Sequence, residues 1–238
     1  MRKLLYIPVI AVLSLALASP AVADQRSRDR NRDRDNEGPR ETERVDRTAT
    51  IRAGGKLRLN NFSGRVTITG SNRGDVAIHA IRRATRERLD RIKLEVTESG
   101  SGVSIEANKK DYRDDDGVVD TEFDIQVPAD ISLDVEVFSS DVIVKDVRGS
   151  QKVHTFSGEI ELSGGESSIN AETFSGDINV KLVNGASARV DFDSFSGDLR
   201  SDVPMSYRGN SRKHVSAEIG AGGTDYHFKT FSGDVRIK

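Results

Sequence analysis

Apolar and polar residues alternate along most of the chain, and the alternation changes phase at regular points. Before Phe174 the apolar positions include Ile169 and Ala171, and after it they are Ile178 and Val180. A period of two is typical of a β-strand that buries one face. The phase changes at a Ser-Gly pair, where glycine can supply the positive φ that a corner requires. The pattern therefore predicts a unit of strand, corner and strand.

This unit recurs along the chain. Each copy carries Phe-Ser followed by Gly or Ser, a charged residue and an apolar residue, and the copies begin at Phe62, Phe138, Phe156, Phe174, Phe195 and Phe231. From Phe138 onward the spacings are 18, 18, 21 and 36 residues. Because 36 is twice 18, we expect one degenerate copy at 215–219, with the sequence VSAEI.

Repeated units of this length predict a stacked architecture. One unit cannot bury its own apolar face, whereas stacked units bury one continuous core. The sequence thus predicts an all-β fold, a single-stranded β-helix (β-solenoid) with turns of about 18 residues. We expect one domain over residues 48–238, with a looser version of the same unit in its N-terminal half. The chain stops inside a strand at Lys238, so an open solenoid end there could support self-association.

The first 47 residues do not contain the repeat and differ from the rest of the chain in composition. Residues 1–23 have a basic start, an apolar run and a small-residue end at Ala21-Val22-Ala23, the layout of a secretory signal peptide. Residues 24–47 contain eight arginines, eight acidic residues and one aliphatic side chain, Val45. Such a segment buries too little apolar surface to offset its ordering entropy, which predicts a disordered charged linker. We expect an exported protein that is periplasmic, associated with the cell envelope or secreted.

The amino-acid composition excludes several kinds of chemistry and gives little support to others. The chain has no cysteine, which excludes disulfides, thiolate chemistry and a lipid-modified cysteine. Its formal net charge of −2 gives no global argument for nucleic acid as a partner. No second long apolar run follows the signal peptide, so we expect no transmembrane segment in the mature chain.

The repeat also carries a resemblance. An Asn60-Asn61-Phe62-Ser63-Gly64 unit, a β-rich stretch that includes Phe123-Asp124-Ile125-Gln126-Val127-Pro128, and the later ladder of Phe-Ser-Gly-Asp corners resemble the bacterial putative-adhesin family of SGD-repeat proteins, a domain-of-unknown-function family. The resemblance covers residues 48–238. It implies a right-handed β-helix and a place in the cell envelope, and it brings no catalytic residues.

The phenylalanines form the main candidate surface. Strict alternation points them outward, where an aromatic ladder could bind sugars or a partner. A break in the alternation at the corner would instead turn them into the core, and we expect this second arrangement because repeat proteins commonly stack identical side chains. The candidate ladder comprises Phe62, Phe138, Phe156, Phe174, Phe195 and Phe231.

Acidic residues follow the corners and form the second candidate set. They are Asp141, Glu159, Asp177, Asp198 and Asp234, with Glu218 in the degenerate copy. Stacked about 5 Å apart, like charges repel, and a calcium ion could relieve this repulsion. Only one acid is available per turn, however, so we expect these side chains to cap the corners and face water, with no bound metal or other cofactor.

No catalytic motif stands out. The histidines (His79, His154, His214 and His227) lack the spacing of a metal site, and no nucleophile elbow is present. We expect a non-enzymatic, adhesin-like binding or structural protein whose partner is an envelope polysaccharide, a surface polymer or a protein. The alternatives are an envelope-stress regulatory component with a protein partner, and a β-helix enzyme that acts on polysaccharide through clustered acids.

Overall fold

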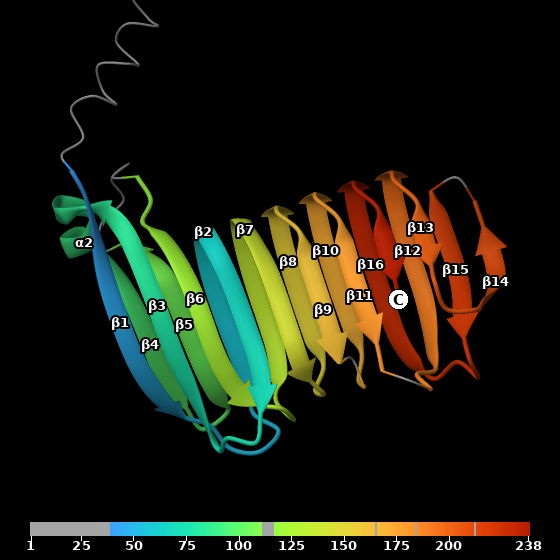
Figure 1. Cartoon of the computed structure of the whole chain (residues 1–238), viewed down its shortest axis with the longest axis horizontal. Helices are drawn as coiled ribbons and strands as arrows, with labels where there is room; N and C mark the ends of the chain where they lie inside the picture. The colour runs from blue at the N-terminus through green and yellow to red at the C-terminus, as the bar shows by residue number, and fades with distance from the viewer. Residues whose placement is uncertain (1–38, 111–116, 165, 184, 212) are drawn as a thin grey trace, which may run out of the picture. The chain divides into compact units, whose positions relative to one another are not determined.

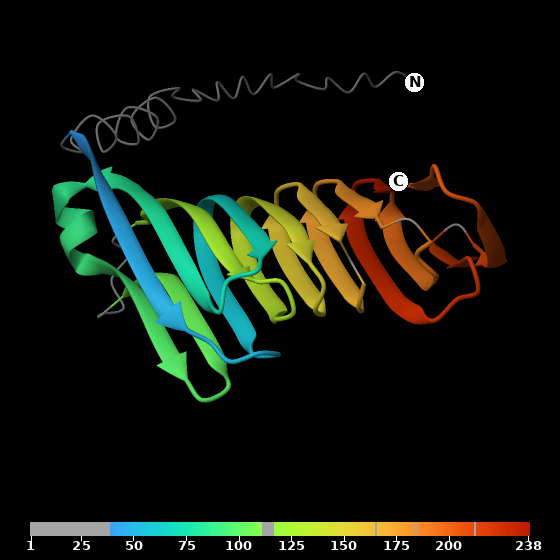
Figure 2. The ribbon, with the colours of Figure 1, turned by 60° about the horizontal axis from the view of Figure 1, so that its bottom comes forward.

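The chain is built almost entirely of β-strands, as the alternation predicts. The computed structural model describes residues 39–110 and 117–238, except 165, 184 and 212, and the helix that it contains there is a single short one, α2 (Arg86–Arg91). The strands lie side by side in a long row (Figures 1 and 2). The predicted signal peptide (1–23) lies outside the described residues, as do 24–38 of the predicted linker.

Two strands run through both layers of this row, namely β2 (Lys56–Ser71) and β7 (Ser132–Val147). Their first halves belong to layer A, which we define as the sheet that contains the strands before the Phe-Ser corners. The order in layer A is β4–β5–β2–β7–β8–β10–β16–β12–β15–β14. The further bounds are β4 (Ile92–Ser99), β5 (Gly102–Lys110), β8 (Gln151–Ser157), β10 (Ile169–Ser175), β12 (Ala188–Ser196), β14 (Met205–Asn210), β15 (His214–Ile219) and β16 (Thr224–Ser232).

The second halves of β2 and β7 belong to layer B, which we define as the sheet that contains the strands after the Phe-Ser corners. Its order is β1–β3–β6–β2–β7–β9–β11–β17–β13. The further bounds are β1 (Arg40–Thr50), β3 (Asp75–Thr85), β6 (Asp120–Pro128), β9 (Ile160–Gly164), β11 (Ile178–Leu182), β13 (Leu199–Ser201) and β17 (Val235–Ile237).

Side chains from both layers pack together in one main core cluster. Ile169 and Ala171 of layer A and Ile178 and Val180 of layer B are all buried in it, which is the phase change seen in the sequence. Most of its members are aliphatic, and few aromatic side chains are buried. A second, smaller cluster lies under α2, where Leu89 packs with Ala84, Ile92 and Val119.

The rungs stack partly in chain order. We define a rung as one strand–corner–strand unit and name it by its phenylalanine. Rungs Phe62, Phe138, Phe156 and Phe174 follow one another through parallel pairing. The chain order does not continue beyond them, because rung Phe231 lies between rungs Phe174 and Phe195. The three extra residues in the 21-residue spacing before Phe195 let the chain reach past one free position, which β16 and β17 later fill.

The degenerate copy expected at 215–219 is not a rung. These residues belong to β15, which pairs antiparallel with both β12 and β14. The alternation at Val215, Ala217 and Ile219 reflects a half-buried strand, and a period of two carries no information about strand direction. The N-terminal half also departs from the expected rungs, because β1–β3, β3–β6 and β4–β5 are antiparallel pairs.

The domain begins earlier than the predicted boundary at Thr48. Residues 40–47, assigned to the disordered linker, form most of β1 and pair with β3. Their side chains are largely exposed, so they need no apolar character. Ion pairs to the neighbouring elements join Glu43 to Arg82, Asp46 to His79 and Glu41 to Arg86. The high charge density therefore marks an exposed edge strand and not an unstructured segment.

The C-terminal strand does not form an open end. Lys238 donates its backbone N–H to the carbonyl of Val180 (2.8 Å) and accepts one from Leu182 (2.9 Å), so β17 lies inside layer B between β11 and β13. The predicted position for self-association at Lys238 is thus wrong, since the edge strands on this side are β13 and β14. Among the described residues, no helix is long and apolar enough to cross a membrane.

Candidate functional site: the phenylalanine ridge

Most corners depend on a glycine that has almost no space for a side chain, and the Phe138 corner has Ser140 at this position. At Gly176, φ is 147°, and a Cβ atom would lie 2.1 Å from the carbonyl oxygen of Gly158 on the preceding rung. The same relation holds between Gly158 and the carbonyl of Ser140, at 2.0 Å. The glycine N–H groups bond to the next rung, as Gly158 does to Ser175 (3.1 Å). The glycine corners can therefore stack this closely because they carry no side chain at this position.

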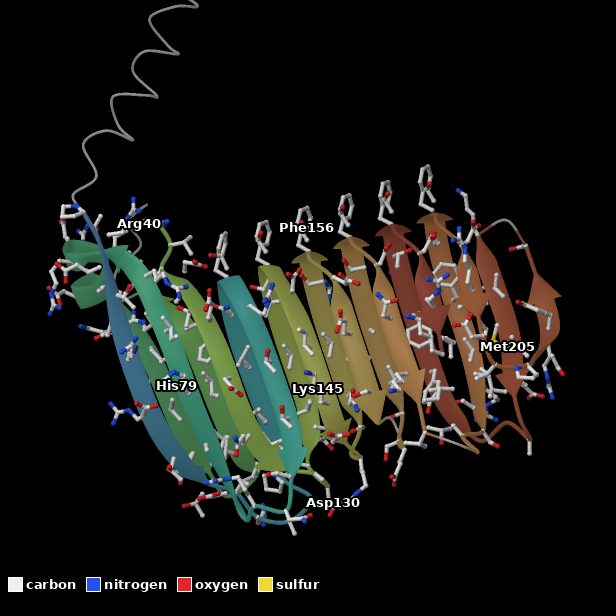
Figure 3. All side chains as sticks on the ribbon, viewed as in Figure 1. Arg40, His79, Asp130, Lys145, Phe156 and Met205 are labelled. Carbon is white, nitrogen blue, oxygen red and sulfur yellow. The ribbon has the colours of Figure 1, made fainter. Side chains whose placement is uncertain are left out.

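The phenylalanines stand on the outside of these corners. Their exposed fractions run from 41% at Phe62 to 60% at Phe195, so the expectation that they turn into the core is wrong. Figure 3 shows the rings projecting in one row along the edge of the strands, with Phe156 labelled. Strict alternation persists through the phenylalanine, since the preceding Thr155 and Thr173 are buried, and the chain bends only afterwards, at the glycine.

Adjacent rings stack on one another. In the order Phe62, Phe138, Phe156, Phe174, Phe231, Phe195, the ring centroids are 4.6 to 4.9 Å apart and the ring planes are inclined by 1 to 18°. We call this row the phenylalanine ridge. Each such pair contributes about 0.5–1.5 kcal/mol beyond area burial. Because most ring faces contact each other, the ridge presents mainly ring edges to solvent.

The corner acids line the layer B side of the ridge. Three of them accept a backbone N–H from the neighbouring rung: Asp141 from Glu159 (3.1 Å), Asp177 from Asp234 (2.8 Å) and Asp234 from Asp198 (2.9 Å). The longer Glu159 instead accepts from the side chain of Asn179 (2.6 Å).

These acids therefore join rungs through hydrogen bonds to the backbone. Glu218 is not among them, because it lies on β15 and pairs with Arg208 (2.7 Å). Within the described part of the chain, no group of three or more histidine and acidic side chains is arranged to hold a metal ion.

A second row lies on the layer A side of the ridge. From Phe138 onward it contains the residue two positions before each phenylalanine, and His214 of β15 extends it. Strand register places Glu136, His154, Glu172, Lys229, Asp193 and His214 next to one another in that order. Here His154 lies 4.0 Å from Glu172, and His214 lies 2.8 Å from Asp193. Sequence reasoning missed this row, although the constant offset from the phenylalanines could have revealed most of it.

A groove of about 410 Å³ lies where this row meets the end of the ridge. Its aromatic wall is formed by Phe174, Phe231 and Phe195. Its polar lining comes from His154, Glu172, Thr173, Asp193, Ser194, Lys213, Lys229 and Thr230. The ammonium group of Lys213 lies 4.7 Å from the ring centroid of Phe195.

Asp134 is the most buried carboxylate on layer A. Burial opposes its ionisation, but Lys152 (3.6 Å), Lys56 (3.6 Å) and Arg58 (3.4 Å) outweigh this effect and lower its pKa from the usual value. The group therefore stays ionised and links three strands, β2, β7 and β8. Of the other sequence candidates, His79 lies far along layer B beside Asp46 (Figure 3), remote from the ridge.

The C-terminal half of the chain matches a known protein family. A family model described as Toastrack DUF4097 matches residues 119–238, half of the chain. The chain belongs to the Toastrack DUF4097 family. The bacterial putative-adhesin resemblance seen in the sequence is thereby confirmed. The match covers five of the six ridge phenylalanines, from Phe138 onward. No curated protein matches the chain.

A solved structure shares the fold of this Toastrack chain. A putative cell adhesion protein from Clostridium sporogenes ATCC 15579 superimposes with a TM-score of 0.60 at 12% identity, covering 82% of this chain and 99% of that protein. A putative adhesin from Bacteroides fragilis NCTC 9343 covers 82% of this chain and 97% of its own at 12% identity, with a TM-score of 0.37. At such low identity, the first of these similarities concerns the fold alone.

Proposed function

We propose that this Toastrack chain is an exported, non-enzymatic protein of the cell envelope or cell surface that binds envelope polysaccharide along its phenylalanine ridge. Rungs Phe138, Phe156 and Phe174 form a short β-solenoid in this proposal, and its right-handed winding stays a prediction. The observation that carries the proposal is the exposed row of six stacked rings.

The size of the ridge supports a binding role. With about 200 Å² per phenylalanine, the exposed fractions correspond to about 550 Å² of apolar surface in one strip. This value is near the upper end of the largest apolar patch on a typical monomer, and such patches often bind a partner. A purely structural stack could bury its rings between the layers, as Phe192 and Phe228 are buried in the same domain.

A further observation supports export, because residues 1–23 have the sequence pattern of a secretory signal peptide.

The test is binding of the full chain, after signal removal, to isolated cell-envelope polysaccharide, with sugar release measured in the same samples. The variant Phe156→Ser/Phe174→Ser removes the middle of the ridge, and Tyr207→Ser is the matched control because Tyr207 is 55% exposed but lies outside the ridge. We expect at least a tenfold loss of affinity for the ridge variant, no change for the control, and no sugar release.

The ridge substitutions also remove ring stacking, so stability is measured in parallel. Each Phe→Ser change is expected to lower the free energy of unfolding by about 2–4 kcal/mol, from lost stacking and burial of the inner half of the ring. If the double variant unfolds, Phe174→Leu keeps the apolar volume but not the ring. Full binding by a folded ridge variant, or release of sugar by the wild type, would contradict the proposal.

A further inference from the structure

The charged side chains of the groove at the end of the ridge differ in their contacts. Each of its acids lies near a histidine nitrogen, Glu172 near that of His154 and Asp193 near that of His214. Within the described residues, neither Lys213 nor Lys229 has a carboxylate oxygen within 4.0 Å, although register places Lys229 between Glu172 and Asp193.

The aromatic wall adds to the attraction that the two lysines exert on an anion. Aromatic rings carry partial positive charge at their edges and partial negative charge on their faces. Stacking hides the faces of Phe174 and Phe231 between neighbouring rings, so these two present their edges to the groove. The outer face of Phe195 does not contact another ridge phenylalanine, and the Lys213 ammonium lies over this ring. Ring edges and ammonium groups both favour an oxyanion.

From this arrangement we propose that the groove binds an acidic sugar residue of a polysaccharide, with the carboxylate between Lys229 and Lys213. This inference rests on the proposed function and specifies its ligand. The pyranose ring would lie along the edges of Phe231 and Phe195. Its hydroxyl groups would donate hydrogen bonds to Glu172 and Asp193, because a carboxylate can accept further hydrogen bonds beside the one contact that each has with a histidine.

The charges around the ridge also indicate how closely acidic sugars can follow one another in the ligand. The corner acids lie on the opposite side of the ridge, and Asp177 and Asp198 there are exposed. A densely charged polyanion that extended across the ridge would meet these carboxylates and be repelled. The groove therefore suits a glycan in which acidic sugars alternate with neutral ones.

The experiment uses a hyaluronan tetrasaccharide, in which uronate alternates with a neutral sugar, and the same tetrasaccharide with its carboxyl groups reduced to alcohols. Both are titrated into the full chain after signal removal. We expect the acidic form to bind at least tenfold more tightly than the reduced form. Lys229→Gln and Lys213→Gln should each weaken binding of the acidic form about tenfold, because each removes a charge-assisted hydrogen bond.

Two controls accompany these variants. Lys145→Gln/Lys181→Gln alters two lysines of a separate groove on layer B and should change nothing. Lys229→Arg keeps the charge and should retain most of the binding. Substitution of exposed lysines leaves the core intact, so folding is not at risk.

The outcomes also separate this inference from the proposed function. Equal binding of the acidic and reduced tetrasaccharides, or unchanged binding by both lysine variants, would overturn the acidic-sugar site. If neither tetrasaccharide binds but the ridge variant Phe156→Ser/Phe174→Ser still loses affinity for envelope polysaccharide, the acidic-sugar site is wrong and the proposed function stands. If the ridge variant also binds envelope polysaccharide normally, both proposals fail.

Discussion

The corner glycines allow a direct test of how the rungs stack, and Gly176→Ala is the sharpest single change. A Cβ atom at this position would lie 2.1 Å from the carbonyl oxygen of Gly158, whereas two heavy atoms need about 3.5 Å. The two rungs would have to separate by more than 1 Å at the corner. The hydrogen bonds from Gly176 to Ser232 (3.2 Å) and from Gly158 to Ser175 (3.1 Å) span the affected corners.

The cost follows from these contacts. The left-handed backbone conformation with φ of 147° adds about 1–2 kcal/mol of strain for alanine. Loss of two inter-rung hydrogen bonds adds about 0.5–1.5 kcal/mol each. The free energy of unfolding should therefore fall by about 2–5 kcal/mol, which lowers Tm by roughly 5–15 °C in a domain of this size.

The assay is thermal unfolding followed by circular dichroism, with two matched alanine variants. Gly54 has φ of 69° but nothing within 4 Å of a Cβ atom, so Gly54→Ala measures the backbone strain alone. Gly74 has neither constraint, so Gly74→Ala should melt like the wild type. We expect Tm to decrease in the order Gly74→Ala, Gly54→Ala, Gly176→Ala. If Gly176→Ala melts together with Gly54→Ala, close approach of the corner backbones is not what excludes a side chain there.

Two further predictions concern ionised groups. The pKa of Asp134 is lowered in the folded state, so its stabilising effect is present above the unfolded value near 3.8 and is lost as pH falls through the folded pKa. Asp134→Asn should therefore lower the free energy of unfolding by about 1–2 kcal/mol at pH 7, measured by urea unfolding, and this free energy should decline less steeply below pH 4 than in the wild type. Equal declines below pH 4 in both proteins would refute this. Calcium chelation should leave Tm unchanged, because Asp141, Asp177 and Asp234 already accept backbone N–H groups; a fall in Tm that added calcium reverses would refute the reading of these acids as corner caps.

The local structure of the rungs follows from the sequence alone. A period of two assigns Ile169 and Ala171 to one buried face, and the phase change at Gly176 places the corner. These features depend on neighbouring residues only, and they are independent of which rung lies next. The same alternation already pointed the phenylalanines outward. The bend that would have turned their side chains inward occurs two residues later, at the glycine.

The order of the rungs and the ends of the stack were decided by the tertiary structure. Every rung presents nearly the same apolar surface and the same backbone hydrogen bonds, so local pattern cannot distinguish neighbours. The 21-residue spacing before Phe195 lets the chain pass one position, and only the return of β16 fills it. The strand at residues 40–47 could not be predicted from the sequence for a related reason. An exposed edge strand is held by backbone pairing and polar side-chain contacts with β3, and neither produces an alternation of apolar residues. The groove with Lys213 and Lys229 likewise exists only because β15 and β16, which follow one another in the sequence, lie on opposite sides of β12.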